Sequence, residues 1–517
     1  MKRNKFLLAS FAIFGSSLLF AQEVEKEEEQ TNLNEVILIG GRTSERTVVN
    51  SSVPVDIIDI EQFKKSSPQL SVNDILNYVI PSFNSVRQSS SDGTEHIDPV
   101  TLRGMGPDQV LVLINGKRRH TTSLVNYQNT VGNGSVGTDL GAIPISAIDK
   151  VEVLRDGAAA QYGSDAIAGV VNIVLKSKPG GDASLTYGQT SRNDGETYNF
   201  NGSFGTKLGK TGSLVFSAVI TDRKKTNRSK DNNLDIFGDN FAYDFADDPA
   251  AARAADDAKL AALGLSRKDF RFQVGDAAIK NQQFFVNAET ALTDRLDFYS
   301  FGGVSLRQGE GFGFRRLPSE LPTEALTIYP NGFQATLKSN INDYSNSTGL
   351  RYSYDGWKID LSNTFGFNSF KYDVDNSINY SLGVDSPTSF YAGKHSFLQN
   401  TVNLDFSKRI NQNFSLAFGG EYRYEKYQIE AGDESSYKGS GSESFVGFSP
   451  LNAVKGDRNS VAVYVDGELK FGDFTANAAG RFENYSDFGS TINGKLAMRY
   501  EYAKGFSVRG AISTGFR

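Results

Sequence analysis

Apolar and polar residues alternate with a period of two along most of the chain after Asp182. Between Phe414 and Glu425, even-numbered positions are apolar, aromatic or glycine, and odd-numbered positions are polar, charged or small. The same arrangement recurs in the runs 461–469, 495–502 and 506–513. Because successive side chains of a β-strand point to opposite faces, the alternation predicts strands with one apolar and one polar face.

The links between the predicted strands alternate in length. We count about thirteen strand candidates of roughly ten residues, the length that a tilted membrane-spanning strand needs. Every second link is tight: Leu208–Gly212, Thr293–Arg295, Asp355–Gly356, Ile410–Asn413, Gly472–Asp473 and Ala503–Lys504. Most of the others are long: Arg223–Asn281, Gln308–Tyr344, Asp375–Lys394 and Tyr427–Arg458. A soluble sandwich does not require this order, whereas an up-and-down barrel with turns on one aqueous side and loops on the other does.

Shorter elements are predicted outside these strands. Val53–Ile58 is a strand pattern and Ile60–Lys65 a short helix pattern. A second helix begins after Ser71, which has the spacing of a capping box, and ends before Pro81. Further on, short β-branched runs separated by glycine turns predict a small mixed sheet: Val110–Asn115, Ile148–Arg155 and Gly169–Lys176. In the first long barrel link, the alanine-rich stretch Pro249–Leu265 predicts a surface helix.

Composition narrows the class of protein. Hydrophobic residues make up only 39% of the chain, yet glycine, tyrosine and phenylalanine are plentiful, as both soluble β proteins and membrane barrels allow. The net charge of −6 argues against nucleic-acid binding. The absence of cysteine excludes disulfides, thiolate metal sites and a lipid-anchored cysteine. With three histidines and no serine-hydrolase or zinc-protease motif, we expect neither an enzyme nor a metal or other cofactor.

The N-terminal residues predict export. Lys2, Arg3 and Lys5 precede the apolar stretch Phe6–Phe20, and Leu19-Phe20-Ala21 is a plausible cleavage site. We therefore interpret residues 1–21 as a signal peptide, with an uncleaved anchor as the alternative. Residues 22–45 would form a flexible arm, because their first part is polar and acidic.

Several ordered segments resemble the plug domain of TonB-dependent outer-membrane receptors. They are Thr101–Gly106, Val110–Arg118, Ile148–Arg155, Gln161–Ser164 and Gly169–Lys176. The resemblance extends from Leu33 to Arg517. It implies an α+β plug domain over residues 46–178, followed over residues 179–517 by an all-β antiparallel up-and-down transmembrane barrel. Family barrels have about 22 strands, so we expect a C-terminally truncated sequence with an incomplete barrel that does not insert stably by itself.

The arm contains one isolated apolar run: Leu33, Asn34, Glu35, Val36, Ile37, Leu38 and Ile39. From its pattern alone, this run could dock on a sheet edge or be offered to another protein by strand addition. It resembles the TonB box, which in the family pairs with the periplasmic energy transducer. The resemblance favours strand addition, with the TonB complex as partner.

The resemblance also assigns site residues. Arg103 and Arg155 match plug arginines that form ion pairs with the barrel, and Glu421 and Glu483 are candidate lumen partners that an arginine fork could bind. The alternative is a set of unpaired lumen charges. Asp156-Gly157 follows Arg155 where the family commonly has Gly-Pro, so Asp156 could compete for that arginine. The plug loops carry His96, His120 and Tyr127 as candidate ligand contacts, and plain loops are the alternative.

The family resemblance implies active import across the Gram-negative outer membrane by a monomer in contact with outer-membrane lipid. The expected ligand is a ferric siderophore or a similar iron complex. Vitamin B12, haem and oligosaccharides remain open, as does a non-transporting adhesin or signalling receptor.

Overall fold

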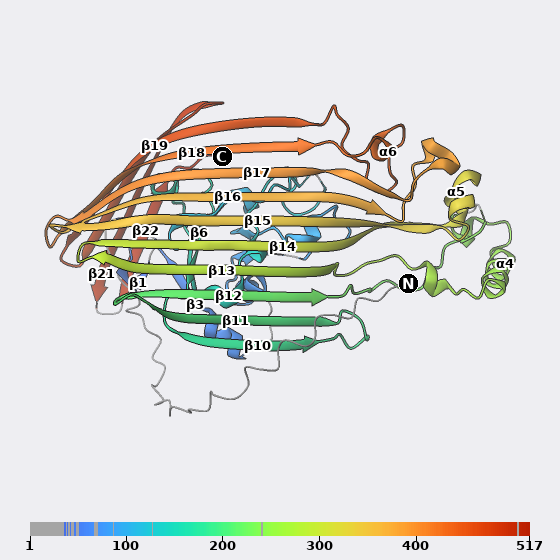
Figure 1. The fold of residues 1–517 in the computed structure, drawn as a ribbon, viewed down its shortest axis with the longest axis horizontal. Coiled ribbons are helices and arrows are strands. Elements are labelled where there is room, and N and C mark those ends of the chain that lie inside the picture. The colour runs from blue at the N-terminus through green and yellow to red at the C-terminus, as the bar shows by residue number, and fades with distance from the viewer. Residues whose placement is uncertain are drawn as a thin grey trace.

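The computed structural model describes residues 36–37, 39, 42, 46–47, 51–66, 71–85, 87–126, 128–238, 241–503 and 506–517. A broad curved sheet of long strands surrounds a smaller domain that precedes it in the chain (Figure 1). This is the predicted order of a plug followed by antiparallel barrel strands.

The curved sheet has 13 strands, and each is hydrogen-bonded to its neighbours in the chain. Every pairing in it is antiparallel. The strands are β10 (Gly180–Gly188), β11 (Thr197–Leu208), β12 (Gly212–Arg223), β13 (Ala278–Thr293), β14 (Leu296–Arg316), β15 (Phe333–Tyr354), β16 (Trp357–Asp375), β17 (Ser389–Arg409), β18 (Phe414–Glu430), β19 (Val454–Phe471), β20 (Phe474–Tyr485), β21 (Gly489–Ala503) and β22 (Phe506–Ser513). The predicted up-and-down topology is confirmed.

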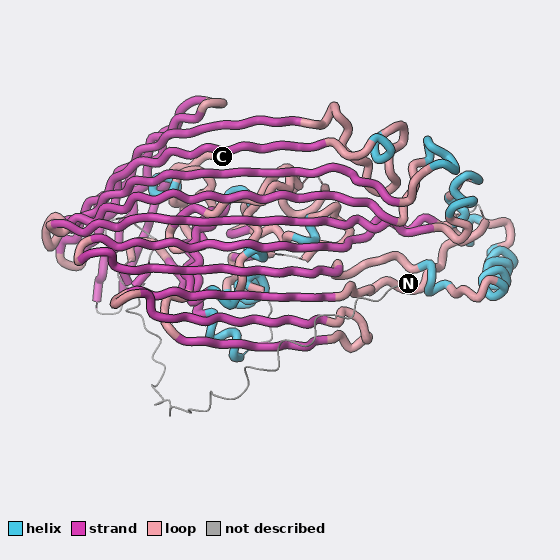
Figure 2. Tube along the Cα trace, in the orientation of Figure 1, coloured by secondary structure: helices cyan, strands magenta, loops and turns pink. Residues whose placement is uncertain are grey.

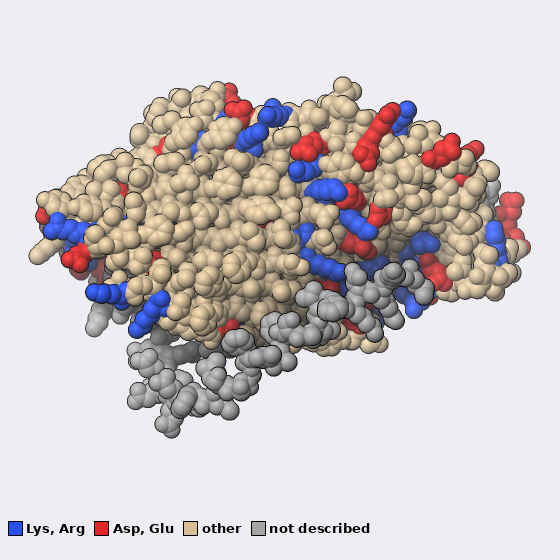
Figure 3. All heavy atoms as spheres, in the orientation of Figure 1, with Lys and Arg blue, Asp and Glu red and all other residues tan. Residues whose placement is uncertain are grey.

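The two faces of this sheet are reversed relative to a soluble protein. On β18, the outward Phe418 and Tyr422 are 38% and 46% exposed, whereas the inward Glu421 and Arg423 are 7% and 2% exposed. One face of the molecule carries a broad belt with few charged side chains, bordered by charged ones (Figure 3). An apolar exterior around a polar interior is the arrangement that a membrane barrel needs.

The two ends of the sheet differ as predicted. Tight turns lie at one end and the longer links at the other, where they include helices (Figure 2). These helices are α4 (Pro249–Ala262), α5 (Thr323–Ile328) and α6 (Glu434–Tyr437). The predicted surface helix in the first long link is α4. Within the part of the chain that the structure describes, no helix has the length and apolarity needed to span a bilayer.

The plug is a small α+β domain inside the curve of the sheet (Figure 1). Its elements are β3 (Val55–Asp59), α1 (Ile60–Ser66), α2 (Val72–Val79), β4 (Phe83–Asn84), β5 (Thr101–Leu102), β6 (Val110–Ile114), β7 (Lys117–Arg118), β8 (Ile148–Leu154), α3 (Ala159–Tyr162) and β9 (Gly169–Leu175). Five of these strands form a sheet in the order β3-β8-β9-β6-β7. It is mixed, as predicted, because β6 and β9 run parallel and the other pairs antiparallel.

Local sequence signals explain the plug elements. The Ser71 side chain accepts a hydrogen bond from the Asp74 amide at 3.2 Å and caps α2, as the capping-box spacing predicts. Asn115 and Gly116 both have positive φ, so they form the tight turn between β6 and β7. We call the curved sheet β10–β22 the wall. The buried core of the plug continues into this wall, where Phe285 and Phe301 pack against it.

Candidate functional site

The candidate functional region of this molecule is the contact between the plug and the inner face of the curved sheet. We call the plug contacts with β14–β21 the fastened seam. The plug contacts with β10–β13 form the cavity seam. Both are built from inward-facing polar residues of the strands, but their chemistry differs.

A buried carboxylate, Asp343 of β15, organises the first part of the fastened seam. It forms an ion pair with Arg119, and its Oδ2 lies 2.9 Å from His120 Nε2. Asn368 of β16 donates to the same carboxylate at 3.0 Å and accepts from the Ser123 amide at 2.8 Å. The Arg119 and Asp343 side chains are only 2% and 5% exposed. Because these groups are dehydrated, each depends on the others for its hydrogen bonds.

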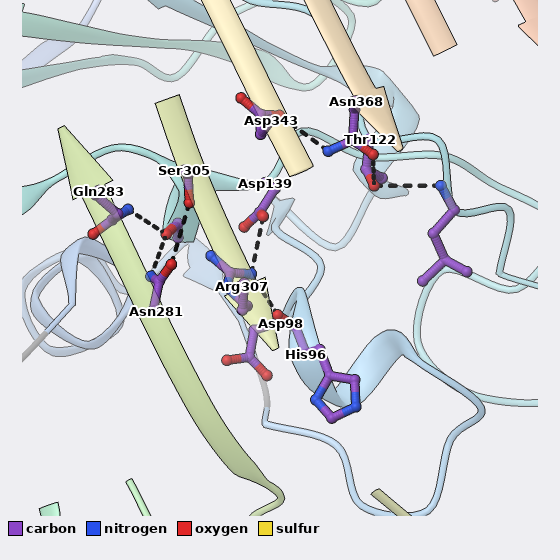
Figure 4. Close-up of polar contacts among 12 residues, drawn as sticks. His96, Asp98, Thr122, Asp139, Asn281, Gln283, Ser305, Arg307, Asp343 and Asn368 are labelled. Atoms are coloured by element: carbon purple, nitrogen blue, oxygen red, sulfur yellow. Dashed lines mark hydrogen bonds and ion pairs between the residues drawn. The ribbon is translucent and has the colours of Figure 1, made fainter. Parts of the chain in front are cut away.

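Two more cations bridge the plug and the wall. Arg307 of β14 donates to the carbonyl oxygen of His96 at 2.5 Å and to Asp139 Oδ2 at 3.0 Å (Figure 4). Lys117 of the plug donates to Asp360 of β16 at 2.9 Å. Since Arg307 and Asp360 both face inward, strand alternation alone brings these side chains to the plug.

A denser ion cluster lies around the turn after α3. Arg118 forms an ion pair with Asp165 inside the plug. Burial by itself raises the pKa of Asp165, but Arg118 and Arg517 outweigh burial and hold that pKa well below its usual range. Gly163, with φ +91°, occupies the gap beside this cluster. A Cβ on it would lie 3.0 Å from Glu483 Oε1 and 3.2 Å from Arg118 Nη2, so the wall and the plug meet closely here, and the positive φ favours glycine.

The arm that precedes the plug is also attached at the fastened seam. Arg42 donates from Nε to the Gln161 carbonyl oxygen at 2.7 Å and from Nη1 to Asp405 of β17 at 3.2 Å. Its guanidinium lies 4.4 Å from the ring centre of Tyr464 and 5.0 Å from that of Tyr162. Arg42 therefore joins the arm, the plug and the wall in one contact.

The cavity seam holds an open space instead of a chain of buried ion pairs. A cavity of about 400 Å³ lies between the plug and the ends of β10–β13 that adjoin the long links. Gln283 of β13 spans the seam by donating to the Gly141 carbonyl oxygen at 2.7 Å. At the turn end of β10, Asp182 pairs with Lys64 and Lys176, but this carboxylate is 38% exposed.

Charged groups line the cavity. Arg87, Arg223 and Arg307 contribute three guanidiniums, against the carboxylates of Asp98 and Asp276. Arg223 Nε and Asp98 Oδ1 are buried and have no hydrogen-bond partner among the described residues. Burial raises the pKa of Asp98 to about 7, although Arg87 and Arg223 oppose the rise. The cavity is thus basic and carries unused hydrogen-bonding capacity, which suits an anionic guest.

Comparison with known proteins agrees with this architecture. Residues 47–170 match the TonB-dependent Receptor Plug Domain, and residues 283–517 match the TonB dependent receptor-like beta-barrel. The chain belongs to the TonB-dependent receptor family. Proteins of this family are receptors and transporters, not enzymes.

Named relatives include siderophore receptors. A segment of 244 residues is 31% identical to ferric enterobactin receptor PirA of Pseudomonas aeruginosa, covering 45% of this chain and 32% of that protein. Vitamin B12 transporter BtuB of Vibrio vulnificus is 21% identical over 97% of this chain and 65% of its own length. A solved variant of ferric enterobactin receptor PfeA from P. aeruginosa has the same fold, with a TM-score of 0.64 at 16% identity over 89% of this chain and 62% of that one. This chain therefore spans less than two thirds of each.

In this TonB-dependent receptor, both candidate ligand histidines of the plug are buried at the wall. His96 lies against Gly309 of β14, and His120 lies against Gly366 of β16. They are 2% and 3% exposed. Burial lowers the pKa of both imidazoles, which keeps them neutral near pH 7. The structure thus gives them plug–wall contacts, their role as ligand contacts stays a prediction, and Tyr127 lies outside the described residues.

The four predicted lock residues are placed in two separate sets. Arg155 binds Asp56 of the plug through two bonds of 2.8 and 3.0 Å, and Arg103 donates to the Ala168 carbonyl oxygen at 3.4 Å. Glu421 and Glu483 lie on the inner face of β18 and β20. Both pair with Arg481 of β20, at 3.2 and 2.9 Å. Among the described contacts, these arginines and glutamates do not meet, and the lock between them stays a prediction.

The predicted TonB box is described only in part. Val36–Ile37 forms the two-residue strand β1, which pairs antiparallel with β2 (Arg46–Thr47). Ile39 is buried in the plug core. Leu33, Asn34, Glu35 and Leu38 lie outside the described residues.

Sequence reasoning missed the residues that fasten the plug most tightly. Arg119, Asp343, Arg307 and Asn368 were not among the candidates. One signal was available: the basic run from Lys117 to His120 directly follows the Asn115-Gly116 turn, and a run of charges behind a buried strand needs partners.

Proposed function

We propose that this protein imports an anionic ferric siderophore across the outer membrane, driven by the TonB complex. The observation that carries this proposal is the basic cavity between the plug and the wall. It lies near the end of the barrel where the long links are, and the outer face of this barrel is apolar. The relatives named for ferric enterobactin support the same ligand class. In this scheme residues 1–21 are a cleaved signal, residues 46–178 the plug and residues 179–517 the barrel segment.

The charge of the cavity distinguishes between the two ligand classes for which relatives are named, ferric siderophores and vitamin B12. Arg87, Arg223 and Arg307 line one space, and a siderophore complex with net negative charge would gain charge-assisted hydrogen bonds from them. Vitamin B12 is the second candidate, because a B12 transporter is similar over 97% of this chain. Arg307 already pairs with Asp139 and Arg87 with Asp276, so the unused capacity lies at Arg223, whose buried Nε has no hydrogen-bond partner among the described residues. An anionic ligand would compensate this charge better than a neutral one, so the cavity favours the anionic complex.

The arm supplies the route for mechanical energy. To pair with the transducer, β1 must leave β2, and this pair is only two residues long. The next attachments along the chain are Ile39 in the plug core and Arg42 in the fastened seam. We propose that the pull on the TonB box reaches the plug and the wall through these two residues.

Uptake assays separate the two candidate ligands. We expect cells that carry the gene to accumulate ⁵⁵Fe from ferric enterobactin under iron limitation, and cells that lack it to lose that uptake. Labelled cyanocobalamin should enter both strains equally. Uptake of cyanocobalamin that follows the gene, with iron uptake unchanged, would contradict the siderophore assignment.

A backbone substitution tests the role of the arm. Val36→Pro removes a ladder donor from β1, so we expect it to abolish uptake while ligand binding to whole cells persists. Thr31→Pro is the matched control, since it places the same residue in the arm but before the predicted TonB box. Normal uptake by Val36→Pro would exclude strand addition at this run.

A further inference from the structure

A basic groove lies on the outer face of the sheet, away from the plug. It has a volume of about 570 Å³ and spans β12–β15 at their loop ends. Four lysines line it: Lys224, Lys225, Lys280 and Lys338. The proposed import function uses none of them.

Strand register places the floor of the groove on the outward face. Asp222 lies opposite Lys280, Lys280 opposite Gln308, and Gln308 opposite Asn340. These positions have the same parity as the exposed apolar residues farther down each strand, because side chains alternate between the two faces. The groove thus faces the surroundings of the barrel, where Figure 3 shows charged side chains bordering the uncharged belt.

The groove continues directly into the apolar belt. Ile220 of β12 is 54% exposed, Phe284 of β13 is 47% exposed and Leu306 of β14 is 39% exposed. Each lies two to four residues from a groove residue on its own strand, in the direction of the tight turns. A molecule seated in the groove would therefore touch amines at one end and bare hydrocarbon at the other.

The groove carries more lysines than carboxylates. Its four lysines face two lining carboxylates, Asp222 and Glu310. Lys224 pairs with Asp222 at 3.1 Å, and Lys225 lies 4.1 Å above the ring of Phe312. Lys338 pairs with Asp375 across the next strand.

Farther round the same border, three lysines each lie beside a carboxylate. Lys371 pairs with Asp373 at 2.9 Å and Lys394 with Glu430 at 3.4 Å. Lys426 of β18 lies opposite Asp457 of β19. In the groove, by contrast, four lysines meet three carboxylates, Asp222, Glu310 and Asp375.

We propose that this groove binds the phosphate-bearing headgroup of an anionic membrane lipid, with the acyl chains lying over Ile220, Phe284 and Leu306. Lysines at a membrane border attract anionic headgroups, and the attraction adds for each lysine near the surface. The continuous apolar surface below the groove selects a lipid over a soluble phosphate compound, because only a lipid fills both parts.

Native mass spectrometry of the detergent-purified protein tests the site, with diphosphoryl lipid A as probe. The variant Lys224→Gln/Lys280→Gln/Lys338→Gln should lower the affinity for this lipid roughly ten- to a hundredfold. The control Lys371→Gln/Lys394→Gln/Lys426→Gln removes the same charge from the same border and should bind as the native protein does. Heat-modifiable migration on gels checks that both variants are folded.

Three outcomes would overturn the proposal. Equal loss in both triple variants would show general attraction and no site. Undiminished binding by the groove variant would exclude the lysines. Equal binding of dephosphorylated lipid A would show that the phosphate is not recognised. Displacement of the lipid by inorganic phosphate alone would show that the acyl chains are not recognised.

Discussion

The fastened seam and the cavity seam hold the same plug by different physics. At the fastened seam, the Arg119–Asp343 pair is almost fully dehydrated. At the cavity seam, the Arg87–Asp276 pair is about one third exposed and stands beside open space. Buried pairs are costly to break, because each partner is left as an uncompensated charge, whereas half-exposed pairs exchange readily with water.

If the plug is pulled as proposed above, this asymmetry predicts where a path opens. Separation at the cavity seam breaks ion pairs whose side chains are already partly in contact with water, such as Arg87–Asp276. A space of about 400 Å³ also exists there already. Separation at the fastened seam would take the buried Arg119 and Arg307 away from their carboxylate partners, Asp343 and Asp139. We therefore expect ligand to pass along β10–β13 while the plug stays attached to β14–β21.

The largest effect is expected from Asp343→Asn. It removes the charge that compensates Arg119 and the acceptor beside His120, which should lower the free energy of unfolding by about 3 kcal/mol. Thermal unfolding of the purified protein measures the loss, and conductance across planar bilayers reports whether the plug is displaced.

Asp355→Asn is the control, because it makes the same change on the same hairpin at a side chain that is 78% exposed. It should leave both measurements near those of the native protein. A similar loss for both variants would mean that burial of Asp343 does not set the strength of the fastened seam.

The fold was predictable because lipid and lumen impose opposite polarity on the two faces of every strand. The alternation around Phe418 and Glu421 carries that signal locally. The fastening contacts were not predictable in the same way. Asp343, Asp360 and Asp405 all have the parity of lumen residues, and only the placement of the plug decides which cation each one meets. Likewise, nothing in the sequence joins His120 to Gly366, where the missing side chain leaves room for the imidazole.

On the cavity seam, Arg223→Gln should weaken ligand binding with little change in stability. Loss of one charge-assisted hydrogen bond predicts an affinity for ferric enterobactin about tenfold lower. Titration by tryptophan or ligand fluorescence measures this. Arg192→Gln, at an exposed arginine in the neighbouring β10–β11 link, should bind normally. If Arg192→Gln weakens binding as much, the effect is one of overall charge and not of the cavity.

A smaller effect is expected where the cavity seam is held by a neutral hydrogen bond. Gln283→Ala removes the donor to the Gly141 carbonyl oxygen and should cost about 1 kcal/mol in thermal unfolding. The comparison of seams requires this loss to be clearly below that of Asp343→Asn. Equal losses would contradict an asymmetrically held plug.

The smallest effect concerns pH and the Asp98 carboxyl in the cavity. Because burial raises its pKa to about 7, Asp98 is mostly neutral at pH 6 and mostly ionised at pH 8. An ionised Asp98 repels an anionic ligand, so the dissociation constant for ferric enterobactin should rise about threefold between these pH values. Asp98→Asn should bind with the native pH 6 affinity at both pH values. If the variant keeps the full pH dependence, the titrating group is not Asp98, and this result would contradict ligand binding in the cavity beside it.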